Sequence, residues 1–198
     1  MVGQDKKIRT RYAPSPTGDP HIGNIRTALF EYLFAKSQGG EFLLRIEDTD
    51  RERYVEGSTE RIIESLKWLG IAPDNIENFP KQSERLELYK RRAYDLIHTG
   101  YAYICTCSKE RLEELRHHQE ANNQPTGYDG RCRSIKYPVS SIKEMEGYLS
   151  KGGVVRMKVP EGRKIVVNDL IRDKVEFDTS LLDDQVILKS DGFPTYHL

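Results

Sequence analysis

The segment from Arg11 to Asn24 constrains the fold of this chain most strongly, because its secondary structure has to change twice within a few residues. Ile8 to Arg11 is basic and β-branched, which favours a strand. Three prolines and a glycine follow and interrupt any β-ladder. A helix is then predicted over residues 22–37, and glycines at 39 and 40 end it. Its apolar face is expected to consist of Ile22, Ile25, Leu29, Tyr32 and Leu33.

The start of this predicted helix has the properties of an anion site. Its first backbone N–H groups have no partner inside the helix and lie at the positive end of the helix dipole, so a phosphate can bind there. Gly23 removes a side chain where a ligand has to approach the backbone. The imidazole of His21 can donate a hydrogen bond to a phosphate oxygen. The structural alternative is that His21 only caps the helix or packs against the turn.

The rest of the first hundred residues predicts further parts of a parallel sheet. Glu41 to Ile46 has the composition of a second strand. Helices are predicted from about Ser58 to Leu69 and from about Ser83 to His98, and each is followed by a glycine. Strands that alternate with helices in this way predict βαβ units. The helix that begins near Ser58 is expected to bury Ile62, Ile63, Leu66 and Leu69.

After Gly100 the sequence predicts a smaller α+β segment. A charged helix is expected over 108–120, and a second helix begins at the capping-box candidate Ser141-x-x-Glu144. Residues 193–198 are expected to return to the parallel sheet. The predicted fold class is therefore α/β, a Rossmann-like parallel sheet interrupted by an α+β insertion. The strands expected in the insertion are 101–106, 154–159, 164–167, 174–177 and 185–188.

Composition excludes several classes of protein. The 198 residues contain no run of eighteen apolar residues, so no membrane span is expected, and the polar start Met1–Lys7 does not resemble a secretory signal. Basic and acidic side chains number 31 each, so any RNA contact has to use local patches. Three cysteines cannot form a full disulfide framework, which favours a cytoplasmic location.

Four motifs carry a resemblance to a known family: Ala13-Pro14-Ser15-Pro16-Thr17-Gly18, His21-Ile22-Gly23-Asn24, Leu44-Arg45-Ile46-Glu47-Asp48-Thr49-Asp50-Arg51 and Asp191-Gly192-Phe193-Pro194-Thr195-Tyr196-His197-Leu198. The second motif resembles the HIGH signature of class I aminoacyl-tRNA synthetases. Together the motifs resemble the bacterial glutamyl-tRNA synthetases over essentially the whole chain. The resemblance implies ATP-dependent activation of L-glutamate and its transfer to the 3′ end of tRNA(Glu). It also implies ATP and Mg²⁺ as cofactors, a monomer and no membrane partner.

The resemblance further implies an organisation in three parts. Residues 1–100 would be the first part of the Rossmann-like catalytic domain, and 101–190 would be the connective peptide, which helps to hold the tRNA acceptor end. Residues 191–198 would begin the return to the catalytic domain. Class I enzymes also need a lysine-rich second ATP loop of the KMSKS type, which does not occur before Leu198. The chain is therefore expected to be an amino-terminal fragment that is inactive by itself.

Site residues follow from the positions that match the family motifs. Arg11 has a guanidinium fork that can pair with a carboxylate, and Glu47, at the end of the second strand, can accept the ammonium group of the substrate. A structural ion pair of Arg11 with an acid at 47, 48 or 50 is the alternative, as is a core position for Tyr196. The resemblance assigns catalysis to His21 and Asn24. It assigns ATP binding to Pro14, Thr17, Gly18, His21, Gly23 and Asn24, and glutamate binding to Arg11, Ala13, Ser15, Glu47 and Tyr196.

The three cysteines and a tyrosine form a candidate zinc site. Cys105-x-Cys107 and Tyr128-x-x-x-Cys132 would provide four ligands for one structural Zn²⁺, although zinc sites usually use Cys and His. Some family members carry Cys-x-His in the second half, where this chain has Ser134. A Tyr ligand resembles the paralogue that glutamylates queuosine. Three ordinary cysteines are the alternative, and His117 and His118 are more often solvated than ligands.

The sequence is also compatible with two other functions. The first is a glutamyl-queuosine tRNA(Asp) synthetase, against which the segments Asn24–Leu29 and Asp48–Arg51 argue. The second is a non-catalytic module that binds RNA or a protein partner, which the missing second ATP loop favours.

Overall fold

The computed structural model describes residues 7–198 and divides them into two compact units, one ending at Arg85 and the other beginning at Leu86. The division groups the helix that follows Arg85 with the second unit. The three-part organisation expected from the sequence, with its boundary after residue 100, stays a prediction. None of the helices in the described part of the chain combines the length and the apolar composition of a membrane span.

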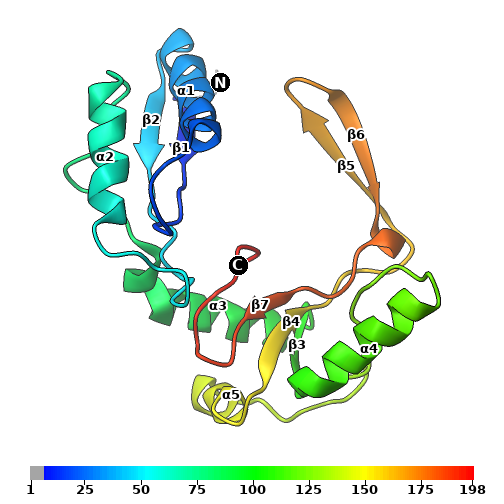
Figure 1. The fold of residues 1–198 in the computed structure, drawn as a ribbon. Helices are drawn as coiled ribbons and strands as arrows, with labels where there is room; N and C mark the ends of the chain where they lie inside the picture. Colours follow the sequence, from blue (N-terminus) through cyan, green and yellow to red (C-terminus); the bar gives the residue numbers. More distant parts are fainter. Residues whose placement is uncertain (1–6) are drawn as a thin grey trace, which may run out of the picture. The chain divides into compact units, whose positions relative to one another are not determined.

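The first unit is a parallel β-α-β arrangement (Figure 1). Strand β1 (Arg9–Tyr12) pairs in parallel with β2 (Glu41–Leu44), and α1 (Ile22–Ser37) connects the two strands and packs against both. An isolated parallel bridge between Ile46 and Lys81 joins the chain after β2 to a further segment. The parallel sheet predicted for this part of the chain is therefore confirmed. The unit also contains α2 (Ser58–Trp68) and a 3-10 turn (Gln82–Arg85).

The core of the first unit uses small residues of α1. Ala28 and Ala35 are fully buried, which lets the helix backbone lie close to the strands. The prediction that Ile22, Leu29 and Leu33 form the buried face was wrong, because these side chains are exposed. The buried cluster consists of Tyr12, Ala28, Ala35, Phe42, Leu44, Ile46, Ile62, Leu66 and Ile71.

Helix α2 was predicted with its correct start and an end one residue too late, and with too wide an apolar face. Ile62 and Leu66 are buried and Ile63 is partly buried, whereas Leu69 is 42% exposed. Leu69 caps the carboxyl end of the helix, where the chain turns through Gly70 with a positive φ of 71°. The turn therefore removes Leu69 from the helical face that packs against the sheet.

Leu66→Ala is expected to lower the free energy of unfolding of the chain by about 2–5 kcal/mol, because a fully buried leucine leaves a cavity when it is truncated. Leu69→Ala, in the same helix, is the matched control and should cost on the order of 1 kcal/mol or less. Urea denaturation followed by circular dichroism measures both. Equal losses for the two variants would contradict this description of the core.

The second unit is built on a three-stranded antiparallel sheet in the order β3-β4-β7. Strands β5 and β6 form a separate hairpin, which pairs Lys164 with Asp178 at its open end and Asp169 with Asp173 next to the turn. The side chains of both strands are largely exposed. A 3-10 turn (Thr179–Leu181) follows the hairpin. The strands are β3 (Ala102–Cys105), β4 (Val154–Met157), β5 (Lys164–Asp169), β6 (Asp173–Asp178) and β7 (Val186–Leu188), and the helices are α3 (Leu86–His98), α4 (Lys109–Ala121) and α5 (Ile142–Leu149).

Two predicted elements need correction. The helix expected from Ser83 is a 3-10 turn as far as Arg85, and the α-helix begins only at Leu86, since Ser83 donates its N–H and hydroxyl to the carboxylate of Asp48. The closing residues do not form a strand of the parallel sheet. Instead they turn back within the second unit, where Pro194 bridges Leu188 and the Thr195 N–H donates to the Ile187 carbonyl. The buried core of the second unit consists of Ala93, Ala102, Ile104, Met145, Leu149, Val155, Ile187 and Leu188.

Candidate functional site

The loop after β1 is fixed by backbone hydrogen bonds to the segment that follows β2. The Glu47 N–H donates to the Pro14 carbonyl and the Val55 N–H to the Pro16 carbonyl, both at 2.9 Å. Pro14 and Pro16 are buried, and this alternation leaves the side chains of Ser15 and Thr17 exposed. The prolines thus anchor the loop, and the hydroxyl groups between them face solvent.

Gly18 closes this loop against the start of α2. Its φ of 144° suits glycine, and its N–H donates to the hydroxyl of Ser58 at 3.3 Å. The same hydroxyl donates back to the Gly18 carbonyl. Ser58 is fully buried, so this contact ties the loop to the interior of the unit.

The start of α1 differs from the predicted anion site. His21 is the N-cap, and its Nδ1 accepts the Gly23 N–H at 3.0 Å, while the N–H groups of Asn24 and Ile25 donate to the His21 carbonyl. The prediction that the first N–H groups are free was therefore wrong for these three residues, because the imidazole and carbonyl of His21 take them. Nδ1 is used by the cap, so a phosphate would have to meet Nε2 of the exposed ring.

Gly23 and Asn24 have separate reasons to occupy their positions. A Cβ at Gly23 would lie 2.8 Å from the His21 ring carbon Cε1, so a side chain here would displace the capping imidazole. Asn24 is half-buried, and its Oδ1 is buried without a hydrogen-bond partner in the described part of the chain. An unpaired buried oxygen is costly, so it marks a place where a ligand donor would be stabilised.

A three-residue charge cluster lies at the carboxyl ends of the two strands. Arg11 Nη1 is 3.2 Å from Glu47 Oε1, and Arg45 Nη2 is 2.6 Å from the same oxygen. The Glu47 side chain is only 12% exposed, so these contacts are shielded from water more than a surface pair. The contact of Arg11 with Glu47 matches the ion pair considered as the alternative to substrate binding. Arg45 was not named as a site residue, although its place two residues before Glu47 puts it on the same side of an extended chain.

The remaining predicted glutamate-site residues are divided between the units. Ala13 is half-buried and Ser15 is exposed in the first unit. Tyr196 belongs to the second unit, and 82% of its surface is exposed. The alternative that Tyr196 is a core residue was therefore wrong.

The four candidate metal ligands lie together in the second unit. The sulfur atoms of Cys105, Cys107 and Cys132 are all within 4.8 Å of one another, and Cys107 and Cys132 are 3.6 Å apart. The Tyr128 hydroxyl is 3.4 Å from the Cys105 sulfur and 3.7 Å from the Cys107 sulfur. His117 and His118 are exposed on α4. The Cys105-x-Cys107 and Tyr128-x-x-x-Cys132 segments of the sequence thus form one cluster in space.

The cluster has the dimensions of a zinc site. Tetrahedral zinc with Zn–S near 2.3 Å and Zn–O near 2.0 Å requires sulfur atoms about 3.8 Å apart and sulfur–oxygen distances of about 3.5 Å. The Cys107–Cys132 sulfur distance of 3.6 Å and the Tyr128 oxygen distances of 3.4 and 3.7 Å are close to these values, and the other sulfur pairs lie within 4.8 Å. Burial raises the pKa of the Cys107 thiol to about 11. Burial also opposes ionisation of Cys132, but hydrogen bonds with the Tyr128 hydroxyl, the Thr106 N–H and the thiols of Cys107 and Cys105 lower the pKa of that thiol to about 7.

The first unit therefore has the architecture of a parallel α/β catalytic domain, with polar side chains gathered after its strands. The sequence profile of the family described as tRNA synthetases class I (E and Q), catalytic domain, matches residues 7–198. This chain belongs to that family.

Individual relatives agree with this assignment. The chain is 51% identical to a glutamate–tRNA ligase of Dehalococcoides mccartyi over 198 residues, which cover 97% of this chain and 39% of the relative. It is 47% identical to that of Finegoldia magna, covering 96% of this chain and 42% of the relative. A crystal structure of a glutamate tRNA ligase from Elizabethkingia meningosepticum in complex with its amino acid superposes with a TM-score of 0.83 at 43% identity, over 97% of this chain and 40% of that chain. The chain spans about 40% of the length of these relatives.

Proposed function

We propose that this chain is the amino-terminal part of the catalytic region of a glutamate–tRNA ligase. Such an enzyme activates L-glutamate with ATP and transfers the glutamyl group to the 3′ end of tRNA(Glu). The observation that carries the proposal is the anchored loop from Arg11 to Asn24, which presents hydroxyl groups, a capping imidazole and an unpaired amide oxygen next to the Arg11–Glu47–Arg45 cluster. The relatives that match over almost the whole chain carry this activity in their names.

In the proposed reaction, the protein acts mainly by positioning its substrates. The glutamate carboxylate attacks the α-phosphate of ATP, and pyrophosphate leaves, so negative charge has to be stabilised on the phosphoryl oxygens. His21 is proposed to donate a hydrogen bond from Nε2 to these oxygens, with Asn24 beside it. Pro14, Thr17, Gly18 and Gly23 complete the proposed ATP site. Mg²⁺ accompanies ATP in such sites, and no residue is assigned to it.

Glutamate is proposed to lie against Arg11, Ala13, Ser15 and Glu47. Tyr196 stays a candidate glutamate contact on the basis of the family motif. Glu47 uses Oε1 for both arginines, which leaves Oε2 as the acceptor for the substrate ammonium group. Arg11 can pair either with Glu47 or with the substrate carboxylate. Arg45 keeps Glu47 paired and oriented when Arg11 turns to the substrate.

Arg11→Lys is expected to raise the KM for glutamate about tenfold or more although the charge is kept. A lysine cannot reproduce a two-pronged contact with a carboxylate, and a charged hydrogen bond contributes about 1.5–3 kcal/mol. The measurement is ATP–pyrophosphate exchange in a chimera, in which this chain is joined to the downstream residues of the Dehalococcoides mccartyi relative. Arg9→Lys, which alters an exposed arginine of the same strand, is the control. Unchanged kcat and KM in Arg11→Lys would make Arg11 a structural residue only.

A structural zinc ion is proposed for the second unit, held by Cys105, Cys107, Cys132 and Tyr128. When bound, the ion would clip β3 to the loop that follows α4. The proposal rests on the match between the observed sulfur and oxygen distances and those of tetrahedral zinc. We further propose that the parent protein acts in the cytoplasm as a monomer, and that residues around the metal site belong to a connective peptide that meets the tRNA acceptor end.

The position of Tyr128 favours a second candidate, a glutamyl-queuosine tRNA(Asp) synthetase. A zinc ligand set that includes a tyrosine resembles that paralogue. Aminoacylation by the chimera distinguishes the two functions. Glutamylation of tRNA(Glu) without queuosine supports the first proposal, whereas a strict requirement for queuosine-modified tRNA(Asp) supports the second. A non-catalytic module would give neither product.

A further inference from the structure

One buried carboxylate in the second unit contacts both chain segments that carry the candidate metal ligands. Asp184 precedes β7 and is only 5% exposed. Its two oxygens accept four hydrogen bonds: from the Tyr103 hydroxyl at 2.6 Å, from Arg133 Nη1 at 2.6 and 2.8 Å, and from the Val159 N–H at 2.8 Å. Every lone-pair position of the carboxylate is thereby used, and its charge is paired with a guanidinium.

The donors on Asp184 are close neighbours of the cysteines. Tyr103 lies two residues before Cys105 on β3, so their side chains share one face of the sheet. Arg133 directly follows Cys132, and its Nη2 also donates to the Val159 carbonyl at 2.6 Å. Asp184 therefore links the strand that carries Cys105 to the turn that carries Cys132, without contacting a metal ligand itself.

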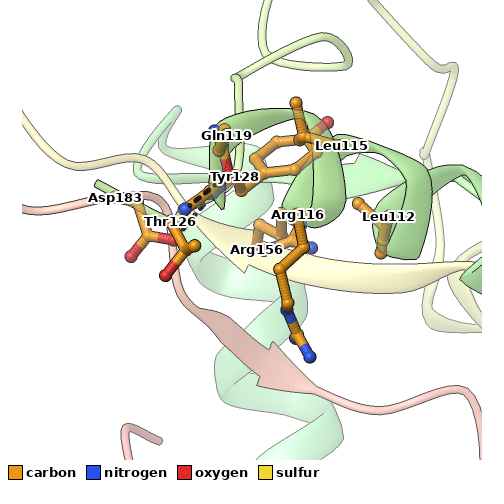
Figure 2. A pocket seen from close by; sticks show the side chains of 9 residues that line it. Leu112, Leu115, Arg116, Gln119, Thr126, Tyr128, Arg156 and Asp183 are labelled. Carbon is orange, nitrogen blue, oxygen red and sulfur yellow. Dashed lines mark hydrogen bonds between the residues drawn. The ribbon is translucent and has the colours of Figure 1, made fainter. Parts of the chain in front are cut away.

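The preceding residue, Asp183, holds the tyrosine of the same cluster. Its Oδ2 accepts the backbone N–H of Tyr128 at 3.0 Å. The guanidinium of Arg156 lies 3.8 Å from the centre of the Tyr128 ring and donates to the Asp184 carbonyl at 2.8 Å. Figure 2 shows Tyr128 above Arg156, with Asp183 to one side. These residues line a pocket of about 280 Å³ together with Leu112, Leu115 and Arg116 of α4. The loop is thus fixed on both sides of the metal ligands by protein groups.

We propose that Asp184, acting through Tyr103 and Arg133, is the positioning residue of the metal site. The inference rests on the proposed zinc site and adds the reason why three thiols and a phenol from distant segments stay within bonding range of one ion. Groups that hydrogen-bond metal ligands typically change metal affinity by about 10–100-fold when they are removed, and we expect the loss of Asp184 to reach the ligands through Tyr103 and Arg133. A residue that only stabilises the fold would leave that affinity unchanged.

The test compares zinc binding by the 198-residue chain and by Asp184→Asn, measured by competition with a chromophoric chelator. The variant is expected to bind one zinc with a dissociation constant about 10–100-fold higher. In cobalt-substituted protein, its thiolate charge-transfer and d–d bands should shift from those of the parent chain. Glu114→Gln is the matched control, because it removes one exposed carboxylate from α4 with the same change in charge, and its affinity and spectrum should not change.

Arg133→Lys keeps the positive charge and tests the same link if Asp184→Asn does not fold. Its side chain is 22% exposed, and a lysine cannot reach both Asp184 and the Val159 carbonyl as the guanidinium does. This variant should also weaken zinc binding, by about tenfold or more. Equal zinc affinity in the parent chain, Asp184→Asn and Arg133→Lys would overturn the proposal, whatever the change in thermal stability.

A separate readout distinguishes failure of the inference from failure of the zinc site. Alkylation of Cys107 and Cys132 by iodoacetamide in metal-free protein reports the positions of the thiols without any ion. If the parent chain binds no zinc but Asp184→Asn alkylates faster, the zinc proposal fails and the positioning role stands. If alkylation rates are the same and zinc affinities are the same, Asp184 has no positioning role.

Discussion

His21→Ala is expected to slow adenylate formation by about 10²–10³-fold while changing the KM for glutamate little. The physical reason is that a donor aimed at developing negative charge stabilises the transition state more than the ground state. His21 keeps Nδ1 for the Gly23 N–H, which fixes the ring so that Nε2 is the nitrogen available to a phosphate. ATP–pyrophosphate exchange in the chimera measures the effect.

His21→Asn separates the catalytic role from the capping role. Asparagine is a good N-cap and can accept the Gly23 N–H with its side-chain oxygen, but it does not place a donor where the imidazole Nε2 lies. Exchange should therefore fall in both variants, whereas the stability of the first unit should fall mainly in His21→Ala, by about 1 kcal/mol. Near-parental exchange in His21→Ala would show that the imidazole serves only as a cap.

Cys132→Ser is expected to abolish stoichiometric zinc binding, lowering the zinc content from about one ion per chain to almost none after dialysis. A hydroxyl is a far weaker zinc ligand than a thiolate, and only three of the four ligands remain. Hydrogen exchange in residues 126–133 should become faster, since the loop loses its metal clip. The His21 region, which lies in the other compact unit, should keep its exchange rates. Elemental analysis and hydrogen-exchange mass spectrometry provide the measurements.

Ser134→Ala is the control for this substitution, because Ser134 is exposed and lies two residues from Cys132. Its zinc content should equal that of the parent chain. A parent chain that contains no metal when prepared without chelator, with all three thiols freely titratable, would mean that the three cysteines are ordinary.

The sequence predicted the arrangement of the first unit because its elements follow local rules. The apolar period and paired glycines predicted α1, and the composition of residues 41–46 predicted β2. Burial alternates along β2, so that Phe42 and Leu44 are buried. The buried face of α1 was not predicted, because the small Ala28 and Ala35 carry little of the hydrophobic signal that larger exposed residues contribute. Packing close to a sheet favours small residues, which a count of apolar side chains does not detect.

Some parts of the candidate sites were predicted from the sequence, and others were not because they depend on contacts in the folded chain. The spacing of cysteines and Tyr128 anticipated a cluster that the structure brings together. The partner of the Gly23 N–H was not predicted, because it depends on the orientation of one imidazole. Arg45 and Asp184 were missed altogether. Their roles arise from contacts with Glu47, two residues away, and with Arg133 and Tyr103, which lie 51 and 81 residues away in the sequence.

The most direct test of the proposed function is amino-acid-dependent ATP–pyrophosphate exchange by the chimera, measured in parallel with the downstream part of the relative alone. We expect exchange that requires L-glutamate, is lost when L-aspartate replaces it, and falls with His21→Ala and Arg11→Lys in this chain. Absence of glutamate-dependent exchange in a folded chimera, or exchange that is indifferent to both substitutions, would contradict the assignment of glutamate activation to residues 11–47.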